Sequence, residues 1–183
     1  MELDISDEII VDRIRAGESD LFGVLMERYE QKLTRYGRKF LARDEQIEDI
    51  VQDVFIKAYQ HLNGYDASRP FSPWIYRIAH NTFINEIKKV QSRPQLMPDF
   101  DILVSHTVYD DPAESERERS DMRLELERGL KLIPDKYREI LLLRYFENME
   151  YRDIADILQI PLGTVSVRIQ RAKQALKKSF EQT

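Results

Sequence analysis

The sequence predicts an all-α fold of two small helical domains joined by an acidic linker. Apolar residues recur every three or four positions along most of the 183 residues, as in amphipathic helices, and no segment alternates as a strand would. This pattern stops between residues 93 and 112, where prolines and acidic residues replace it, as in an interdomain linker. We therefore expect domains at residues 1–92 and 113–183, with the linker at 93–112.

The composition excludes several classes of function. The chain has 42% apolar residues, enough for packed cores, and no cysteine, which rules out disulfides, thiolate zinc sites and cysteine nucleophiles. His61, His80 and His106 are too scattered to share a metal, so we expect neither a metal nor another cofactor. No apolar run approaches the ~20 residues that span a bilayer, and the acidic start is unlike a signal peptide. We expect a cytoplasmic protein without membrane insertion.

The net charge of −5 disfavours a protein that binds DNA by itself, because such domains usually carry a basic excess that releases counterions from phosphates. The negative charge is concentrated in the centre of the chain. Residues 91–121 hold eight acidic and three basic residues, which accounts for the whole net charge. The flanking parts are therefore neutral in sum and can still carry local basic faces.

Three helices are expected in the first 62 residues. Ser6 can cap a short helix through Ile14 that Gly17 ends. A long helix from about residue 20 to 41 carries one core-facing stripe, formed by Leu21, Phe22, Leu25, Tyr29, Leu33, Tyr36 and Phe40. The helix at 44–62 buries Ile47, Ile50, Val51, Val54, Phe55 and Ala58.

The outer face of the helix at 44–62 carries acidic and amide groups one turn apart beside apolar residues that the core does not use. These residues are Asp49, Gln52, Asp53, Ile56 and Tyr59. Such a face fits a docking surface for a protein partner. From the residues alone, a solvated face with one stray isoleucine is the preferred interpretation.

A turn-rich loop at 63–70 precedes a fourth helix. Ser72 as the N-cap and Pro73 as the first helical residue predict its start. Its apolar stripe reaches about residue 90 through Trp74, Ile75, Ile78, Ala79, Phe83 and Ile87.

Aromatic, amide and basic side chains of the loop and of the opposite face of this helix resemble sites that hold single-stranded bases. They include Tyr65, Arg69, Asn81, Asn85 and Lys88. We assign Phe71 and Trp74 to the core; for Tyr65, Asn81 and Lys88 a structural role remains an equal alternative.

The second domain starts at Asp111–Pro112, with helices expected at 113–132 and 134–146. Two short amphipathic helices joined near Pro161 then predict a helix-turn-helix. The apolar face of the first consists of Ile154, Ala155 and Leu158, and that of the second, which begins at 160–162, of Leu162, Val165, Ile169, Ala172 and Leu176.

The second helix of this pair is basic, since residues 164–183 hold five basic residues and one acidic residue. Its outward hydroxyl, amide and guanidinium groups match the base edges and phosphates of a major groove. The residues that face outward near its start are Thr164, Ser166, Val167, Arg168, Gln170 and Arg171. A purely structural helix pair is the alternative, and the charge favours DNA.

Four segments carry a family resemblance: DIVQDVFIKAY at 49–59, FSPWIYRIAHN at 71–81, LIPDKYR at 132–138 and GTVSVRIQRAK at 163–173. In this order and spacing the chain resembles bacterial sigma factors of the extracytoplasmic-function (ECF) group, which keep only sigma regions 2 and 4. The resemblance implies a subunit without catalysis of its own. It would bind core RNA polymerase, direct initiation at promoters through their −10 and −35 elements, and commonly be held by an anti-sigma factor.

The resemblance also implies roles for single residues. Asp49, Gln52 and Asp53, beside Ile56, match polymerase-contacting positions, which reverses the preference for a solvated face. Tyr65 and Asn81, with Arg69, Asn85 and Lys88 nearby, match positions that hold a flipped −10 base. Extruding a base costs a few kcal/mol, so stacking and hydrogen bonding must compensate. The −35 positions are Thr164, Ser166, Arg168 and Arg171, beside Gln170 and Lys173.

Three departures from the family pattern alter these expectations. Arg77–Ile78 stands where primary sigma factors have a tryptophan pair that wedges the duplex open, so melting should depend more on a good −10 sequence. Glu150 replaces a common capping serine, so we expect a looser start of the helix at Tyr151. Ser166 replaces an often basic residue, which should alter the −35 preference.

The acidic linker also has an expected role. The resemblance implies that the linker enters the polymerase cleft, where Asp99, Asp101, Asp110 and Asp111 would mimic RNA phosphates until the transcript displaces them. A two-domain activator that senses a ligand is one rival function, but it has no reason to keep the face at Asp49. A hydrolase that uses Asp49 and Asp53 as acid and base is another, but no histidine, nucleophile or phosphate loop accompanies them. We therefore expect no small-molecule substrate.

Overall fold

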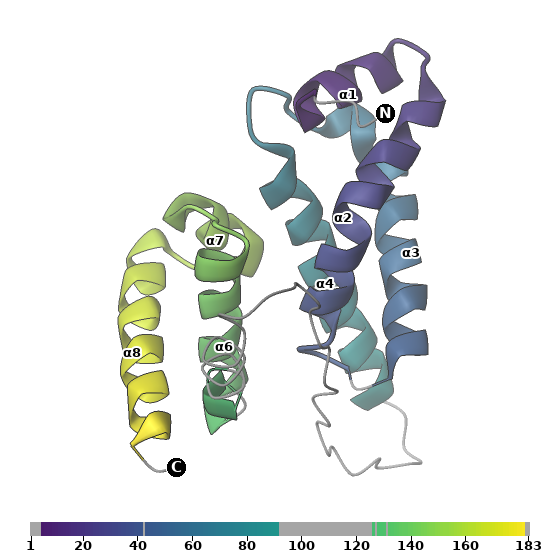
Figure 1. The fold of residues 1–183 in the computed structure, drawn as a ribbon. Coiled ribbons are helices and arrows are strands. Elements are labelled where there is room, and N and C mark those ends of the chain that lie inside the picture. The colour runs from purple at the N-terminus through teal and green to yellow at the C-terminus, as the bar shows by residue number, and fades with distance from the viewer. Residues whose placement is uncertain (1–4, 42, 92–125, 127, 131, 182–183) are drawn as a thin grey trace, which may run out of the picture. The chain divides into compact units, whose positions relative to one another are not determined.

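The computed structural model describes residues 5–41, 43–91, 126, 128–130 and 132–181, and all regular structure within these ranges is helical (Figure 1). This confirms the all-α prediction. The chain forms two compact units, an N-terminal one and a C-terminal one. The linker, its expected boundaries and most of the helix expected at 113–132 lie outside the described residues. None of the described helices is long and apolar enough to cross a membrane.

In the N-terminal unit, three long helices lie side by side and a short one lies across their end (Figure 1). The long helices are α2 (Phe22–Gly37), α3 (Asp44–His61) and α4 (Phe71–Gln91). The short helix α1 (Asp7–Arg15) is capped as predicted, with Ser6 Oγ accepting the Ile9 N–H. Two 3-10 turns, η1 (Ser19–Leu21) and η2 (Leu62–Gly64), precede α2 and follow α3.

The core of this unit follows the helical stripes. All six residues predicted to be buried on α3 are buried, and so are the five central residues of the α2 stripe. The prediction for α2 was too long, because the helix ends at Gly37 and the chain turns with the Phe40 and Leu41 N–H groups bonded to the Gly37 carbonyl at 2.8 and 3.1 Å. Phe40 then stacks on Phe83 of α4, with ring centroids 5.2 Å apart.

The start of α4 differs from the prediction. Ser72 lies inside the helix, which begins at Phe71, and the Phe71 N–H donates to Glu8 Oε1 of α1 at 3.0 Å. A carboxylate from a distant helix thus satisfies one of the free N–H groups at the helix start, a role that local sequence assigned to a serine. Phe71 is fully buried as expected, but Trp74 is only partly buried.

The C-terminal unit contains α6 (Asp135–Leu141), which continues into a π-helical turn η3 (Leu142–Phe146), then α7 (Tyr151–Leu158) and α8 (Leu162–Phe180). Helix α8 packs against both α6 and α7. The buried guanidinium of Arg138 supports the chain before α6, since its Nε donates to the Leu130 carbonyl at 2.7 Å and Nη2 to that of Ile133 at 3.3 Å.

Helices α7 and α8 begin where the sequence predicts, at Tyr151 and Leu162, but α7 has a different apolar face. Ile154 and Ile157 are buried there, whereas Ala155 and Leu158 are only partly so. Helix α7 ends at Gln159, which takes a left-handed conformation with φ of 53° and redirects the chain toward Pro161.

Candidate nucleic-acid interface

The first turns of α8 are oriented by the face that they bury. Val165, Ile169 and Ala172 are buried, so the remaining circumference of the helix is turned to solvent. Five predicted −35 residues are exposed and Arg168 is partly exposed. The exposed five are Thr164, Ser166, Gln170, Arg171 and Lys173.

These six side chains do not form a single row. At about 100° per residue, Thr164, Arg168 and Arg171 flank the buried face on one side, while Ser166, Gln170 and Lys173 flank it on the other. The centre of the outward face belongs to Val167, which is 47% exposed. The sequence predicts that Val167 faces outward but assigns it no contact with DNA. An apolar side chain at this place suits the methyl group of a thymine.

Lys173 is held at the edge of this surface. Its Nζ lies 5.1 Å from the centroid of the Tyr145 ring, and a hydrogen bond with the Tyr145 side chain raises the pKa of Lys173 above its usual value. The ammonium group is therefore charged at neutral pH and leans toward η3, a position suited to a backbone phosphate more than to a base edge.

The start of α7 is better fixed than the sequence suggested. Glu150 and Asp153 form a reciprocal capping box, in which the Glu150 N–H donates to Asp153 Oδ2 at 3.3 Å. Arg144 adds a bond to the Met149 carbonyl at 2.8 Å and an ion pair with Glu150 at 3.4 Å. The expected loosening at Tyr151 is therefore wrong, since a carboxylate replaces the serine as the cap.

A shallow depression of about 530 Å³ lies where the starts of α7 and α8 meet. It is lined by Glu150, Tyr151, Arg152, Leu162, Gly163 and Ser166. Leu162 is exposed in it, although the sequence assigned this residue to the buried face of α8. The depression joins the flank of α8 that carries Ser166, and it extends the surface that a duplex could contact.

The loop between α3 and α4 is closed around Tyr65, whose side chain is only 4% exposed. Its ring packs on Phe71 and Trp74, with centroids 5.5 and 5.2 Å away, and its hydroxyl donates to the Arg69 carbonyl. Burial raises the pKa of Tyr65, so the phenol stays protonated. In this conformation the ring organises the loop, and a base could stack on it only if the loop opened.

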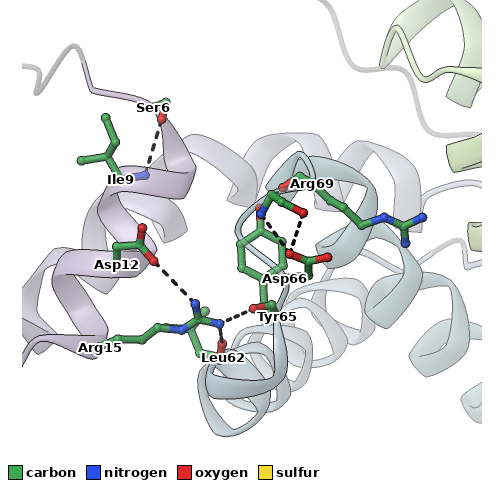
Figure 2. A network of polar contacts seen from close by, with 9 residues as sticks. Ser6, Ile9, Asp12, Arg15, Leu62, Tyr65, Asp66 and Arg69 are labelled. Carbon is green, nitrogen blue, oxygen red and sulfur yellow. Dashed lines mark hydrogen bonds and ion pairs between the residues drawn. The ribbon is translucent and has the colours of Figure 1, made fainter.

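Hydrogen bonds also join residues within the loop and connect the loop to α1 (Figure 2). Asp66 Oδ1 accepts the Ser68 N–H at 3.0 Å and the Ser68 hydroxyl at 2.7 Å, a turn that Asp typically forms. Arg15 of α1 donates to the carbonyls of Leu62, at 2.7 Å, and Tyr65. No pattern in the loop itself predicts this arginine, which is about fifty residues away in sequence.

The other −10 candidates continue along α4 from the loop. Trp74, Asn81, Asn85 and Lys88 are spaced by seven, four and three residues, so they share one face of the helix. At 1.5 Å per residue, Asn81 lies about 10 Å along α4 from Trp74, against which Tyr65 packs. Asn81 thus lies about two helical turns further along α4 than the residue against which Tyr65 packs. The structure shows a row of partly exposed or exposed side chains that starts at Trp74.

The outer face of α3 is exposed as predicted. Asp49, Gln52 and Asp53 are exposed, and Ile56 is 54% exposed between them and Tyr59. Tyr59 also packs edge-on against Phe22, with centroids 5.0 Å apart, so its position is fixed by α2. The face combines negative charge with an apolar centre, a composition suited to a protein partner.

Comparisons with known proteins agree with this arrangement. Residues 25–93 match the family model for sigma-70 region 2, and residues 123–176 match that for sigma-70 region 4. The chain is 31% identical over 181 residues to the ECF RNA polymerase sigma factor SigW of Bacillus subtilis, covering 93% of this chain and 94% of the relative. It is also 31% identical to the RNA polymerase sigma-H factor of Pseudomonas aeruginosa, covering 96% of this chain and 94% of the relative.

A solved structure has the same fold over nearly the whole chain. It is that of CnrH in complex with the cytosolic domain of CnrY, with a TM-score of 0.66, 26% identity and coverage of 96% of this chain and 97% of CnrH. The two sigma regions correspond to the two helical units, with the loop around Tyr65 in the first and the helix pair α7–α8 in the second. The chain therefore belongs to the ECF group of RNA polymerase sigma factors.

Proposed function

We propose that three surfaces of this chain each bind a different partner during promoter recognition. As an ECF sigma factor, the chain directs promoter-specific initiation of transcription. In the proposal the outer face of α3 binds core RNA polymerase, the Tyr65 loop and the row on α4 bind the melted −10 element, and α8 reads the −35 duplex. The chain acts in the cytoplasm and performs no catalysis.

The observation that carries this proposal is the placement of the polar and apolar faces on α3 and α8. Each helix buries one continuous apolar stripe and leaves the residues of its proposed contact surface exposed or partly exposed. On α8 the exposed groups on either side of Val167 are cations, hydroxyls and amides, which bind phosphates and base edges. On α3 they are carboxylates around Ile56, which would repel DNA and favour a basic protein surface.

An anti-sigma factor is a further proposed partner. The CnrH structure was solved with a cytosolic domain of a second protein, CnrY, bound to it. The exposed apolar side chains on both units, among them Ile56 and Leu162, are of the kind that such a partner covers.

Transcription with purified core RNA polymerase tests the proposal. The wild-type chain should start transcripts at a small set of genomic sites that share −10 and −35 sequences. A variant with Asp49→Asn and Asp53→Asn should bind core polymerase at least about tenfold more weakly, because charge pairs across an interface contribute more than about 1.4 kcal/mol. The matched control is Glu27→Gln with Glu30→Gln, which removes two exposed carboxylates from α2.

The two variants separate the possible outcomes. Equal core affinity for both would contradict the assignment of the α3 face. Random transcript starts from the wild-type holoenzyme would contradict the function as a whole.

A further inference from the structure

Helix α1 is joined to the Tyr65 loop by an arginine at its last turn (Figure 2). One terminal nitrogen of Arg15 donates to the carbonyl of Leu62 at 2.7 Å and to that of Tyr65. The other terminal nitrogen pairs with Asp12 at 3.5 Å, which orients the guanidinium from within α1. The same group lies 5.8 Å from the centroid of the Tyr65 ring. A single side chain thus contacts both ends of the turn from which Tyr65 projects.

A second contact joins α1 to the far end of the loop. Glu8 Oε1 accepts the N–H of Phe71, the first residue of α4, at 3.0 Å. Phe71 in turn packs against Tyr65. The loop is therefore held at its start by Arg15 and at its end by Glu8, and both residues belong to one short helix.

Helix α1 itself is anchored away from the loop. Ile10 and Val11 are fully buried, and Asp7 pairs with Arg28 of α2 at 2.6 Å and accepts the hydroxyl of Tyr29 at 2.6 Å. A movement of the loop would therefore break charged hydrogen bonds without carrying α1 along. Hydrogen bonds to charged groups are the stronger ones, so these contacts add to the restraint that Asp66 and Ser68 give the loop from within.

We propose that Arg15 and Glu8 are positioning residues for recognition of the −10 strand. They fix the backbone of residues 62–71 and so determine where Tyr65 and Trp74 meet the single strand. This inference rests on the proposed −10 role of the loop. It adds α1 to the recognition unit, although neither residue needs to touch DNA.

The test compares Arg15→Gln with Arg13→Gln in the full chain bound to core RNA polymerase. Arg13 lies on the same helix and pairs with Glu18, so its variant loses the same charge without losing a loop contact. Binding of a fluorescent single-stranded oligonucleotide with the −10 sequence is measured beside a scrambled one. We expect about tenfold weaker −10 binding for Arg15→Gln and no change for Arg13→Gln. Binding to core polymerase and to a −35 duplex should be unchanged in both.

Two more variants distinguish positioning from a general loss of stability. Arg15→Lys keeps the charge but not the planar fork, so part of the −10 binding should return. Glu8→Gln keeps an acceptor for the Phe71 N–H but loses its charge, so it should retain more −10 binding than Glu8→Ala, which should resemble Arg15→Gln.

Amide hydrogen exchange of the free chain gives a readout that is independent of DNA. The Tyr65 and Arg69 N–H groups are bonded to Leu62 and Asp66 carbonyls at 3.1 and 3.0 Å. Both should exchange faster in Arg15→Gln and not in Arg13→Gln. If Arg15→Gln matches Arg13→Gln in both exchange and −10 binding, the inference is wrong while the proposed function stands. If the wild-type holoenzyme does not prefer the −10 oligonucleotide over the scrambled one, the proposed −10 role fails, and the inference fails with it.

Discussion

The ring of Phe83 on α4 occupies the space next to Gly37, at the end of α2, where any side chain would project. A Cβ atom on Gly37 would lie 2.5 Å from Phe83 Cζ and 2.7 Å from Ile47 Cγ2 of α3. The three long helices of region 2 therefore meet at a point where only a hydrogen atom fits. This contact holds together the scaffold that carries both the α3 face and the α4 row.

Replacing Gly37 by alanine should destabilise region 2 by about 1–3 kcal/mol, because two core side chains must shift to admit one methyl group. Gly23→Ala is the matched control on the same helix, since nothing lies within 4 Å of its added Cβ. That variant should be neutral or stabilising by up to about 1 kcal/mol. Denaturation followed by the fluorescence of Trp74, the single tryptophan, measures both. Equal effects would contradict the close packing.

The stability of region 2 should depend on pH through Glu8. Burial of this carboxyl raises its pKa, but hydrogen bonds from its own N–H, from Phe71 and from Ser6 outweigh this and bring the pKa below 4.5. The carboxylate thus stabilises the folded state above the unfolded pKa, and this contribution is lost as the pH falls through the lower folded pKa. Glu8→Gln should flatten that part of the unfolding free energy between about pH 6 and pH 3. An unchanged pH profile would contradict the assignment.

The sequence predicted the helices more reliably than the contacts between them. Buried positions on α3 followed from spacing alone, because a helix that packs on one side repeats its apolar residues every 3.6 positions. The cap of α4 could not be predicted in this way, since Glu8 is 63 residues from Phe71 and only the fold brings them together. Local rules favoured Ser72, which is a good cap in isolation.

In the candidate site, too, the exposure of side chains could be predicted from the sequence, whereas contacts between distant residues could not. Exposure of Asp49, Gln52 and Asp53, and of most of the −35 residues, follows from the faces that α3 and α8 bury. The closed state of Tyr65 depends on Arg15 and Trp74, and neither partner is implied by the loop sequence. The family resemblance supplied roles for positions, but not the conformation in which the ring is held.

Arg138 should be essential for the stability of region 4. Its buried guanidinium donates hydrogen bonds to the Leu130 and Ile133 carbonyls. Without Arg138, both carbonyls would lose a charged donor. Arg138→Met keeps the length of the side chain and should cost about 2–3 kcal/mol. Lys136→Met removes the same charge from the exposed side of α6 and should change stability by less than about 0.5 kcal/mol.

Two probes assign the Arg138 effect to the correct unit. Far-UV circular dichroism reports both helical units, whereas fluorescence of Trp74 reports region 2 only. The transition of Arg138→Met should shift in the first signal and not in the second. A shift of the fluorescence transition would show that the two units do not unfold independently.

Arg171 and Lys173 should affect −35 binding in different ways, although they are two residues apart on α8. Arg171 is exposed on the flank that also carries Thr164, so Arg171→Ala should cost about 1–3 kcal/mol and relax the preference at one base pair. Lys173 leans toward Tyr145, so Lys173→Ala should weaken every sequence equally and reduce the slope of affinity against salt by about 1. Binding of the holoenzyme to singly substituted −35 duplexes at several salt concentrations measures both effects. If Arg171→Ala lost the same affinity on every duplex, Arg171 would contact only phosphate, and base recognition on α8 would have to rest on Val167 and the flank that carries Ser166.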